Sequence, residues 1–220
     1  MKEQPLYTTG GIILDYDYFK IASIMTILRA KGLYQNKPML SLPFLDWFES
    51  YDFSDFNLIE FGSGNSTNYF ADKVETVVSF ETDINFYNNF KSSLSENVDY
   101  RFIQKYDLEN KTPDIEINDK TIVFVDCASN RLLLTKNIFE IESPNILILD
   151  NSNDYKNTCK FMYNKGYLEI PFWGLRFNEV EESCTSVFIK NGFNMIEKNY
   201  DYFSVGSTVK QDNSWDIDSE

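Results

Sequence analysis

Five short apolar segments, each followed by a longer polar or amphipathic stretch, are the feature that most limits the fold of this chain. They cover residues 57–61, 76–81, 99–104, 121–126 and 145–150. Such strands, separated by helix-length segments, are typical of parallel βαβ units with helices on both sheet faces. Helices are expected to begin at Ser66, at Asp83 and near Asn130, with another over residues 153–164. The pattern predicts an α/β fold with a mainly parallel sheet.

The two ends of the chain differ from this repeating pattern. Apolar residues at helical spacing predict a helix over 17–32, and a second over 41–51 with Ser41 as its cap and Pro43 in its first turn. Residues 166–175 and 184–193 predict two β segments joined by a reversal, an antiparallel edge on the sheet. We therefore expect three parts in the chain. Residues 1–54 form a helical cap over the ligand-binding edge of the sheet, residues 55–205 form one domain, and residues 206–220 are a disordered acidic tail.

Composition excludes several classes of function. The chain of 220 residues carries 34 acidic and 20 basic residues, a formal charge of -14, so we expect neither nucleic acid nor a membrane as partner. Histidine is absent, which excludes Ser-His-Asp and Cys-His hydrolases. Cys127, Cys159 and Cys184 form no CxxC pair, so they are expected to be reduced thiols. With no apolar signal or spanning segment, a cytoplasmic location is expected, and the oligomeric state stays open.

All five predicted strands end at, or lead to, an acidic residue, at the sheet edge where open α/β sheets bind ligands. The acids are Glu60, Glu81, Asp107, Asp126 and Asp150. Glu60 leads into the turn Gly62-Ser63-Gly64, and Glu81 follows at roughly the 20-residue distance at which an acid binds ribose hydroxyls. Thr67 replaces the third glycine of the dinucleotide motif, so a plain strand-to-helix turn is the alternative. Asp83 is more simply a helix cap, and Asp107 is either a surface acid or a neighbour of an adenine edge.

The segments EFGSGNST (60–67) and VVSFETD (77–83) resemble the class I S-adenosylmethionine-dependent methyltransferases, in particular small bacterial members. The resemblance implies a Rossmann-like, seven-stranded sheet. It also implies that residues 62–66 surround the methionine part of the cofactor, with Glu81 at the ribose and Asp107 near the adenine. The expected cofactor-binding residues are Glu60, Gly62, Ser63, Gly64, Asn65, Ser66, Glu81, Thr82, Asp107 and Asp126. An acidic edge suits a sulfonium and an ammonium, whereas it suits a pyrophosphate poorly.

A second resemblance concerns a possible metal site. VFVDCASNR and LILDNSND are similar to the catechol and caffeoyl-coenzyme A O-methyltransferase branch, which implies Mg²⁺ on Asp126, Asp150 and Asn151. The lysine that serves as base in that branch is replaced here by Ser129. The alternative is that Asp150 and Asn151 only cap the next helix or form an Asx turn. No catalytic residue is assigned, and the nearby Arg131 and Tyr155 have no predicted role.

Together these patterns predict methyl transfer from S-adenosylmethionine to a small-molecule acceptor, at oxygen. Residues 171–174 are the best candidate for a substrate loop. A protein of the same fold that binds the cofactor without catalysis is one alternative. An NAD-linked sugar-nucleotide enzyme is another.

Overall fold

The computed structural model describes residues 37–193 except 112 and 178–182, together with 6–7, 13–14, 23–24, 27 and 30–32. The predicted tail at 206–220 and most of the predicted helix at 17–32 lie outside these residues. Residues 23–24, 27 and 30 are helical, as expected. Ile24 and Ile27 are more than half exposed, at 55% and 53%, so the structure does not bury the predicted apolar face at these two positions.

The core of the molecule is a seven-stranded sheet in the order β5-β4-β3-β6-β7-β9-β8. Its strands are β3 (Asn57–Phe61), β4 (Thr76–Glu81), β5 (Val98–Phe102), β6 (Thr121–Val125), β7 (Ile146–Leu149), β8 (Tyr167–Gly174) and β9 (Ser183–Lys190). Neighbouring strands are parallel except that β9 runs antiparallel to both β7 and β8. A separate pair, β1 (Leu6–Tyr7) and β2 (Ile13–Leu14), is antiparallel. The predicted α/β sheet with an antiparallel edge is confirmed.

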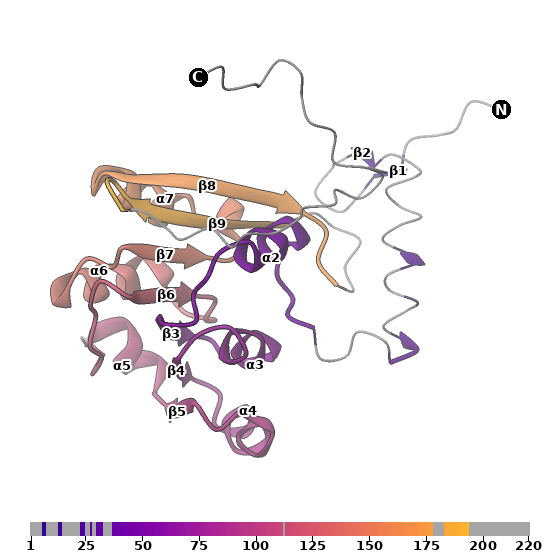
Figure 1. Cartoon of the computed structure of the whole chain (residues 1–220), viewed down its shortest axis with the longest axis horizontal. Helices are drawn as coiled ribbons and strands as arrows, with labels where there is room; N and C mark the ends of the chain where they lie inside the picture. The colour runs from indigo at the N-terminus through magenta and orange to yellow at the C-terminus, as the bar shows by residue number, and fades with distance from the viewer. Residues whose placement is uncertain are drawn as a thin grey trace, which may run out of the picture.

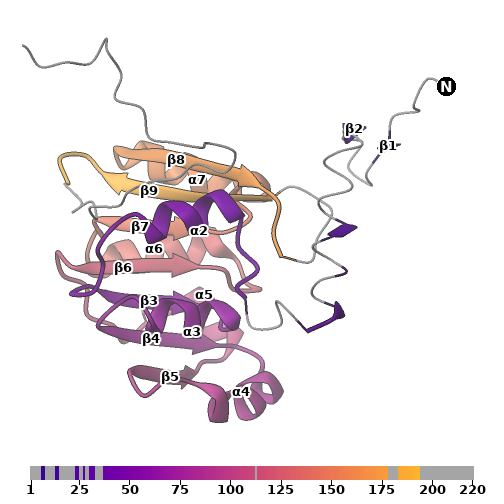
Figure 2. The ribbon, with the colours of Figure 1, turned by 45° about the vertical axis from the view of Figure 1, so that its right-hand side comes forward.

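Helices cover both faces of this sheet (Figure 1, Figure 2). They are α2 (Leu42–Glu49), α3 (Asn65–Ala71), α4 (Ile84–Phe90), α5 (Lys105–Asn110), α6 (Arg131–Ile141) and α7 (Lys156–Asn164), with 3₁₀ turns η1 (Lys91–Ser93) and η2 (Ser152–Asp154). Side chains of α2 and α3 share one apolar core with one face of the sheet. Those of α5, α6 and α7 share a second core with the other face. Burial on both faces explains why the central strands are almost entirely apolar.

The register of the central strands brings the predicted site together. Phe61, the last residue of β3, pairs with Phe80 of β4 and with Val125 of β6. These strands therefore end at the same level, and the polar residues that follow them meet at one edge of the sheet. This edge, with the loops beyond it, is called the active edge below.

Two local predictions at the helices need correction. Ser41 precedes α2 as expected, but its side chain makes no capping hydrogen bond, and its backbone N–H donates instead to Thr185 Oγ1 at 3.3 Å. Helix α5 was not predicted, because Leu108 is its single buried residue and no apolar periodicity marks it. The predicted cap at Asp83 is confirmed by bonds from the backbone N–H groups of Asn85 and Phe86.

Two further features agree with the sequence. The three cysteines are free and buried. Within the described ranges, every helix is too short or too polar to cross a lipid bilayer.

Candidate functional site

The turn after β3 is pressed against the end of β6. Gly62 has a φ of +99°, and a Cβ atom placed there would lie 2.7 Å from the backbone carbon and oxygen of Asp126. No residue with a side chain fits this position without moving the β6 backbone. Gly64 differs, because the nearest atom to a Cβ placed there would be Ser66 Oγ at 3.9 Å. The space beside Gly64 is therefore open to a ligand.

Glu60 lies beneath this turn and organises it. Its side chain is fully buried and accepts hydrogen bonds from Ser66 Oγ at 2.6 Å and from Thr67 Oγ1 and Ser79 Oγ at 2.5 Å. Thr67 Oγ1 also accepts a bond from the Gly64 N–H at 3.0 Å. Burial raises the pKa of Glu60 to about 7, against the opposing effect of these hydroxyls. Glu60 thus ties β3, β4 and the start of α3 together.

Glu81, at the end of β4, holds the other side of the turn. Its Oε1 accepts from the backbone N–H groups of Thr82 at 2.6 Å and Asp83 at 2.7 Å. Its Oε2 accepts from the Ser63 N–H at 3.3 Å. The predicted pairing of the glycine turn with an acid after the second strand is therefore present as a direct contact.

Two more predicted acids lie beyond neighbouring strands. Asp107 is in the first turn of α5, with its side chain 34% exposed and 2.8 Å from Lys111 Nζ. Asp126 directly follows β6, and its N–H donates to Phe61 O at 2.8 Å. Restricted hydration, and then the neighbouring Asp150 carboxylate, raise the pKa of Asp126 to about 7. The structure thus brings Asp126 against the glycine turn and places Asp107 on the helix that follows β5.

Comparison with known proteins rests on structure alone. No family model matches the chain, and no curated protein matches its sequence. Cofactor-bound Rv0187 from MTB shares 12% identity over 86% of this chain and 100% of its own, with a TM-score of 0.53. The O-methyltransferase from Bacillus cereus, in complex with SAH, shares 14% identity over 84% and 96%, with a TM-score of 0.47. A candidate tRNA (m1A22) methyltransferase from Streptococcus pneumoniae shares 14% identity over 68% and 70%, with a TM-score of 0.47.

The strand order decides the fold. Five parallel strands in the order β5-β4-β3-β6-β7 are followed by the antiparallel β9, inserted between β7 and β8. The chain has the class I methyltransferase fold. Within that fold, the glycine turn follows β3 and Glu81 ends β4, which are the first two parallel strands along the chain.

The donors and the space at this end of the class I methyltransferase fold suit S-adenosylmethionine. Glu81 Oε2 receives a single N–H, and a carboxylate oxygen can accept more than one donor, such as a ribose hydroxyl. The open side of Gly64 allows a ligand to approach the backbone. Because Asp126 is paired with a guanidinium, Glu81 is the carboxylate of the turn that can face a sulfonium or an ammonium.

Mg²⁺ does not fit the three residues predicted to bind it. Asp150 is 1% exposed, and its Oδ1 accepts from Thr185 Oγ1 at 2.6 Å. The side chain of Asn151 bonds to the Ser183 hydroxyl at 3.1 Å. Asp126 Oδ1 is paired with a guanidinium. No group of three or more His, Cys, Asp or Glu side chains that could hold a metal occurs in the part of the chain that the structure describes.

That guanidinium belongs to Arg131, which joins the ends of β6 and β7. Its Nη2 donates to Asp126 Oδ1 at 2.9 Å, its Nη1 to Asp150 O at 2.5 Å, and its Nε to Cys127 O at 3.0 Å. The guanidinium also lies over the Tyr155 ring at 4.1 Å, and the residue is 4% exposed. A protein cation therefore lies between two of the predicted metal ligands.

A second arginine approaches Asp150. Arg176 Nη1 is 3.9 Å from Asp150 Oδ2. With Arg131 beside Asp126, each of the two strand-end carboxylates has a guanidinium for a neighbour.

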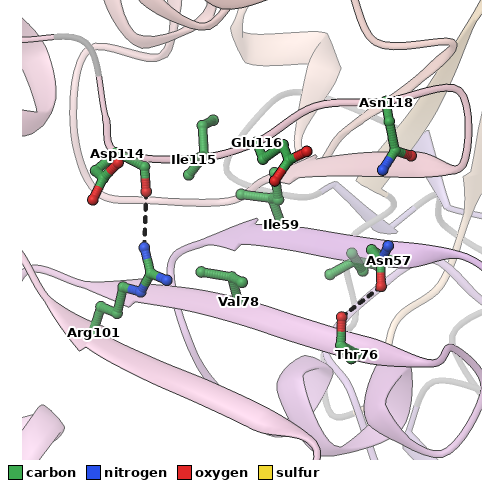
Figure 3. A pocket seen from close by; sticks show the side chains of 10 residues that line it. Asn57, Ile59, Thr76, Val78, Arg101, Asp114, Ile115, Glu116 and Asn118 are labelled. Atoms are coloured by element: carbon green, nitrogen blue, oxygen red, sulfur yellow. Dashed lines mark hydrogen bonds between the residues drawn. The ribbon is translucent and has the colours of Figure 1, made fainter.

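Two of the cavities beside the described sheet bear on the position of the site. One of about 440 Å³ lies between β3, β4 and β5 and residues 114–118, and it reaches Asn57 and Thr76, the first residues of β3 and β4 (Figure 3). Arg101 Nη1 closes it by donating to Asp114 O at 2.8 Å. Its lining includes neither the glycine turn nor Glu81 or Asp126, so it is not part of the active edge.

The second cavity, of about 500 Å³, lies between α7 and β8. Ser152 and Asn153 line it directly after the Asp150-Asn151 pair, together with Lys156 and Trp173. Residues 171–174 belong to β8 and are not a loop, contrary to the sequence-based expectation. The exposed Trp173 is nevertheless on the wall of this cavity.

Sequence reasoning missed the residues that hold the acids in place. Thr67 was noted only as a replacement for glycine, and Ser79 and Arg131 were given no role. A signal existed for Ser79, because it is a polar residue inside the otherwise apolar run of β4. The role of Arg131 had no comparable signal, since an arginine at the start of a helix is ordinarily exposed.

Proposed function

We propose that this protein transfers the methyl group of S-adenosylmethionine to an oxygen atom of a small molecule. The observation that carries the proposal is the contact between Glu81 and the backbone of Ser63, which joins a ribose-binding acid to a glycine turn. Glu81 and Thr82 would hold the ribose, Asp107 would lie near the adenine, and residues 62–66 would surround the methionine part. Asp126 would face the sulfonium, and Glu60 would act by holding the turn.

Catalysis of this kind asks little of side-chain chemistry. An enzyme that aligns the acceptor oxygen with the sulfonium methyl group, and excludes water, gains most of its acceleration from proximity and desolvation. The absence of histidine is compatible with such a mechanism. The cavity beside Asn153 and Trp173 adjoins the active edge, and this supports an acceptor of small-molecule size.

Ligand binding tests the cofactor assignment most directly. We expect S-adenosylhomocysteine, but not NAD, to raise the melting temperature and to give a saturable calorimetric signal. Glu81→Gln should weaken binding about tenfold or more, because bonds to a charged acceptor are lost. The exposed Glu96 offers a matched control, and Glu96→Gln should bind normally.

The outcomes separate the alternatives. Stabilisation by NAD in place of S-adenosylhomocysteine would favour a dinucleotide enzyme. Tight binding of S-adenosylhomocysteine, with no methyl transfer from S-adenosylmethionine to a broad panel of hydroxyl compounds, would favour a binding protein without catalysis. Methylation at nitrogen or carbon would retain the enzyme class and refute the oxygen acceptor.

A further inference from the structure

Three polar side chains form a row across the sheet directly below the glycine turn. Glu60 of β3 pairs in register with Ser79 of β4, and Ser79 pairs with Tyr100 of β5. Interior positions of a parallel sheet covered by helices are normally apolar. Glu60 and Ser79 are explained by their mutual hydrogen bond at 2.5 Å. None of the hydrogen bonds described so far includes the Tyr100 hydroxyl, so its presence in this row is not yet explained.

The surroundings of Tyr100 point its hydroxyl toward the turn. Its ring packs against Tyr87 of α4, with the ring centres 4.6 Å apart. Its hydroxyl oxygen is buried and makes no hydrogen bond of ordinary length among the described residues, although the Ser63 side chain is near enough to lower its pKa. The polar groups around it include the side chain of Ser63 and the carboxylates of Glu81 and Glu60.

Chemistry sets the direction of any bond that this hydroxyl makes. A phenol that keeps its proton can donate to the Ser63 hydroxyl or to the Glu81 carboxylate, which only accepts when it is ionised. Burial raises the pKa of Tyr100 to about 12, which keeps its proton in place. Ser63 is the residue through which the donation can reach the turn, because its Oγ lies 2.8 Å from Ser79 Oγ and its N–H donates to Glu81 Oε2. A small shift of Ser63 would give the buried hydroxyl a hydrogen-bond partner.

We infer that Tyr100 is a positioning residue of the cofactor site, whose hydroxyl acts through Ser63 to orient the Glu81 carboxylate toward the ribose. The inference rests on the proposed function. It differs from a structural role in a measurable way. A hydroxyl that is unpaired in the free protein and paired in the complex should favour binding without favouring folding.

Tyr100→Phe removes the hydroxyl and keeps the ring. We expect the variant to bind S-adenosylhomocysteine about 3- to 10-fold more weakly by calorimetry, while its melting temperature without ligand is unchanged or raised. Tyr87→Phe is the matched control, since the Tyr87 hydroxyl contacts only Tyr100 O among the bonds described, at 3.4 Å. Its affinity should equal that of the wild type.

A double-mutant cycle with Ser63→Ala tests the route of the effect. Because Tyr100 acts through Ser63, the double variant should bind no more weakly than Ser63→Ala alone. Additive losses, an unchanged affinity of Tyr100→Phe, or a Tyr100→Phe protein that fails to fold would each overturn the inference and leave the proposed function standing. Wild-type protein that binds no S-adenosylhomocysteine would overturn both.

Discussion

Gly62 and Gly64 are two residues apart in the same turn, yet they should respond differently to a side chain. Gly62 has a left-handed φ and lies against the Asp126 backbone, whereas Gly64 is extended, with a φ of 175° and open space beside it. Backbone atoms that directly follow a central strand cannot move aside as a flexible side chain can. The fold therefore requires glycine at position 62, whereas the space beside Gly64 is available for a ligand.

A pair of alanine substitutions separates these two roles. Gly62→Ala should lower the free energy of unfolding by about 2–4 kcal/mol, from strain and overpacking. Gly64→Ala should change it by less than about 1 kcal/mol and should weaken binding of S-adenosylhomocysteine, because its methyl group enters the open space. Urea denaturation and calorimetry measure the two effects. Equal stability of both variants would contradict the assignment.

Glu60 couples the same turn to pH. Its pKa is about 7 in the folded protein, against 4.5 for the unperturbed group. Between these values the folded state binds more protons than the unfolded state, so its contribution to stability is present at low pH and lost as pH rises. The loss reaches at most about 3 kcal/mol by pH 7.

Glu60→Gln should remove this dependence. The variant cannot ionise at this position, so its unfolding free energy should fall less than that of the wild type between pH 4.5 and 7. Denaturation curves at several pH values, compared with those of the exposed control Glu96→Gln, measure the difference in slope. Parallel pH profiles for Glu60→Gln and the wild type would show that Glu60 keeps an ordinary pKa.

At the scale of elements, Arg131 fastens the end of β6 to the end of β7 through one carboxylate and two backbone carbonyls. Arg131→Met should destabilise the fold by about 3–5 kcal/mol, since it leaves Asp126 and these carbonyls without their donor. Lysine should not restore stability, because it lacks the planar fork of donors. Lys136, exposed on the same helix, provides the control, and Lys136→Met should be neutral in denaturant unfolding.

The contacts of Arg131 also predict how the protein responds to metal. Added Mg²⁺ should leave the melting temperature unchanged, and EDTA should not affect binding of S-adenosylhomocysteine. Arg131 and Thr185 already hold Asp126 and Asp150, so a divalent ion would have to displace a guanidinium and a hydroxyl. Saturable stabilisation by Mg²⁺ that is lost in Asp150→Ala would contradict this expectation.

Strands whose side chains are buried on both faces of the sheet could be predicted from the sequence. The predicted bounds of β3 and β4 are those observed, because apolar runs with polar ends leave little choice of register. Helix α5 was not predictable, since its sequence KYDLEN buries Leu108 alone. At the site, the acids could be located by their place after each strand. Their partners could not, because Arg131 and Thr185 reach them only after the chain has folded.

The whole molecule carries a formal charge of -14, and some of its cations pair with its own acids. Ion pairs of the described residues join Lys73 to Glu49, Arg101 to Asp99, Lys111 to Asp107, Lys120 to Asp55 and Arg131 to Asp126. A polyanion gains affinity by replacing counterions with free lysine and arginine side chains. In this chain the acidic residues outnumber the basic ones by 34 to 20, and their repulsion of phosphate opposes that gain.

Bulk tRNA should therefore show no saturable binding, either at about 150 mM salt or at a lower ionic strength that favours phosphate contacts. Fluorescence anisotropy of labelled tRNA, with a basic RNA-binding protein as positive control, makes the measurement. Net repulsion should keep the anisotropy flat as protein is added. A saturable rise that weakens steeply with salt would reveal a surface that binds phosphate groups. It would also move the proposed acceptor from a small molecule to RNA.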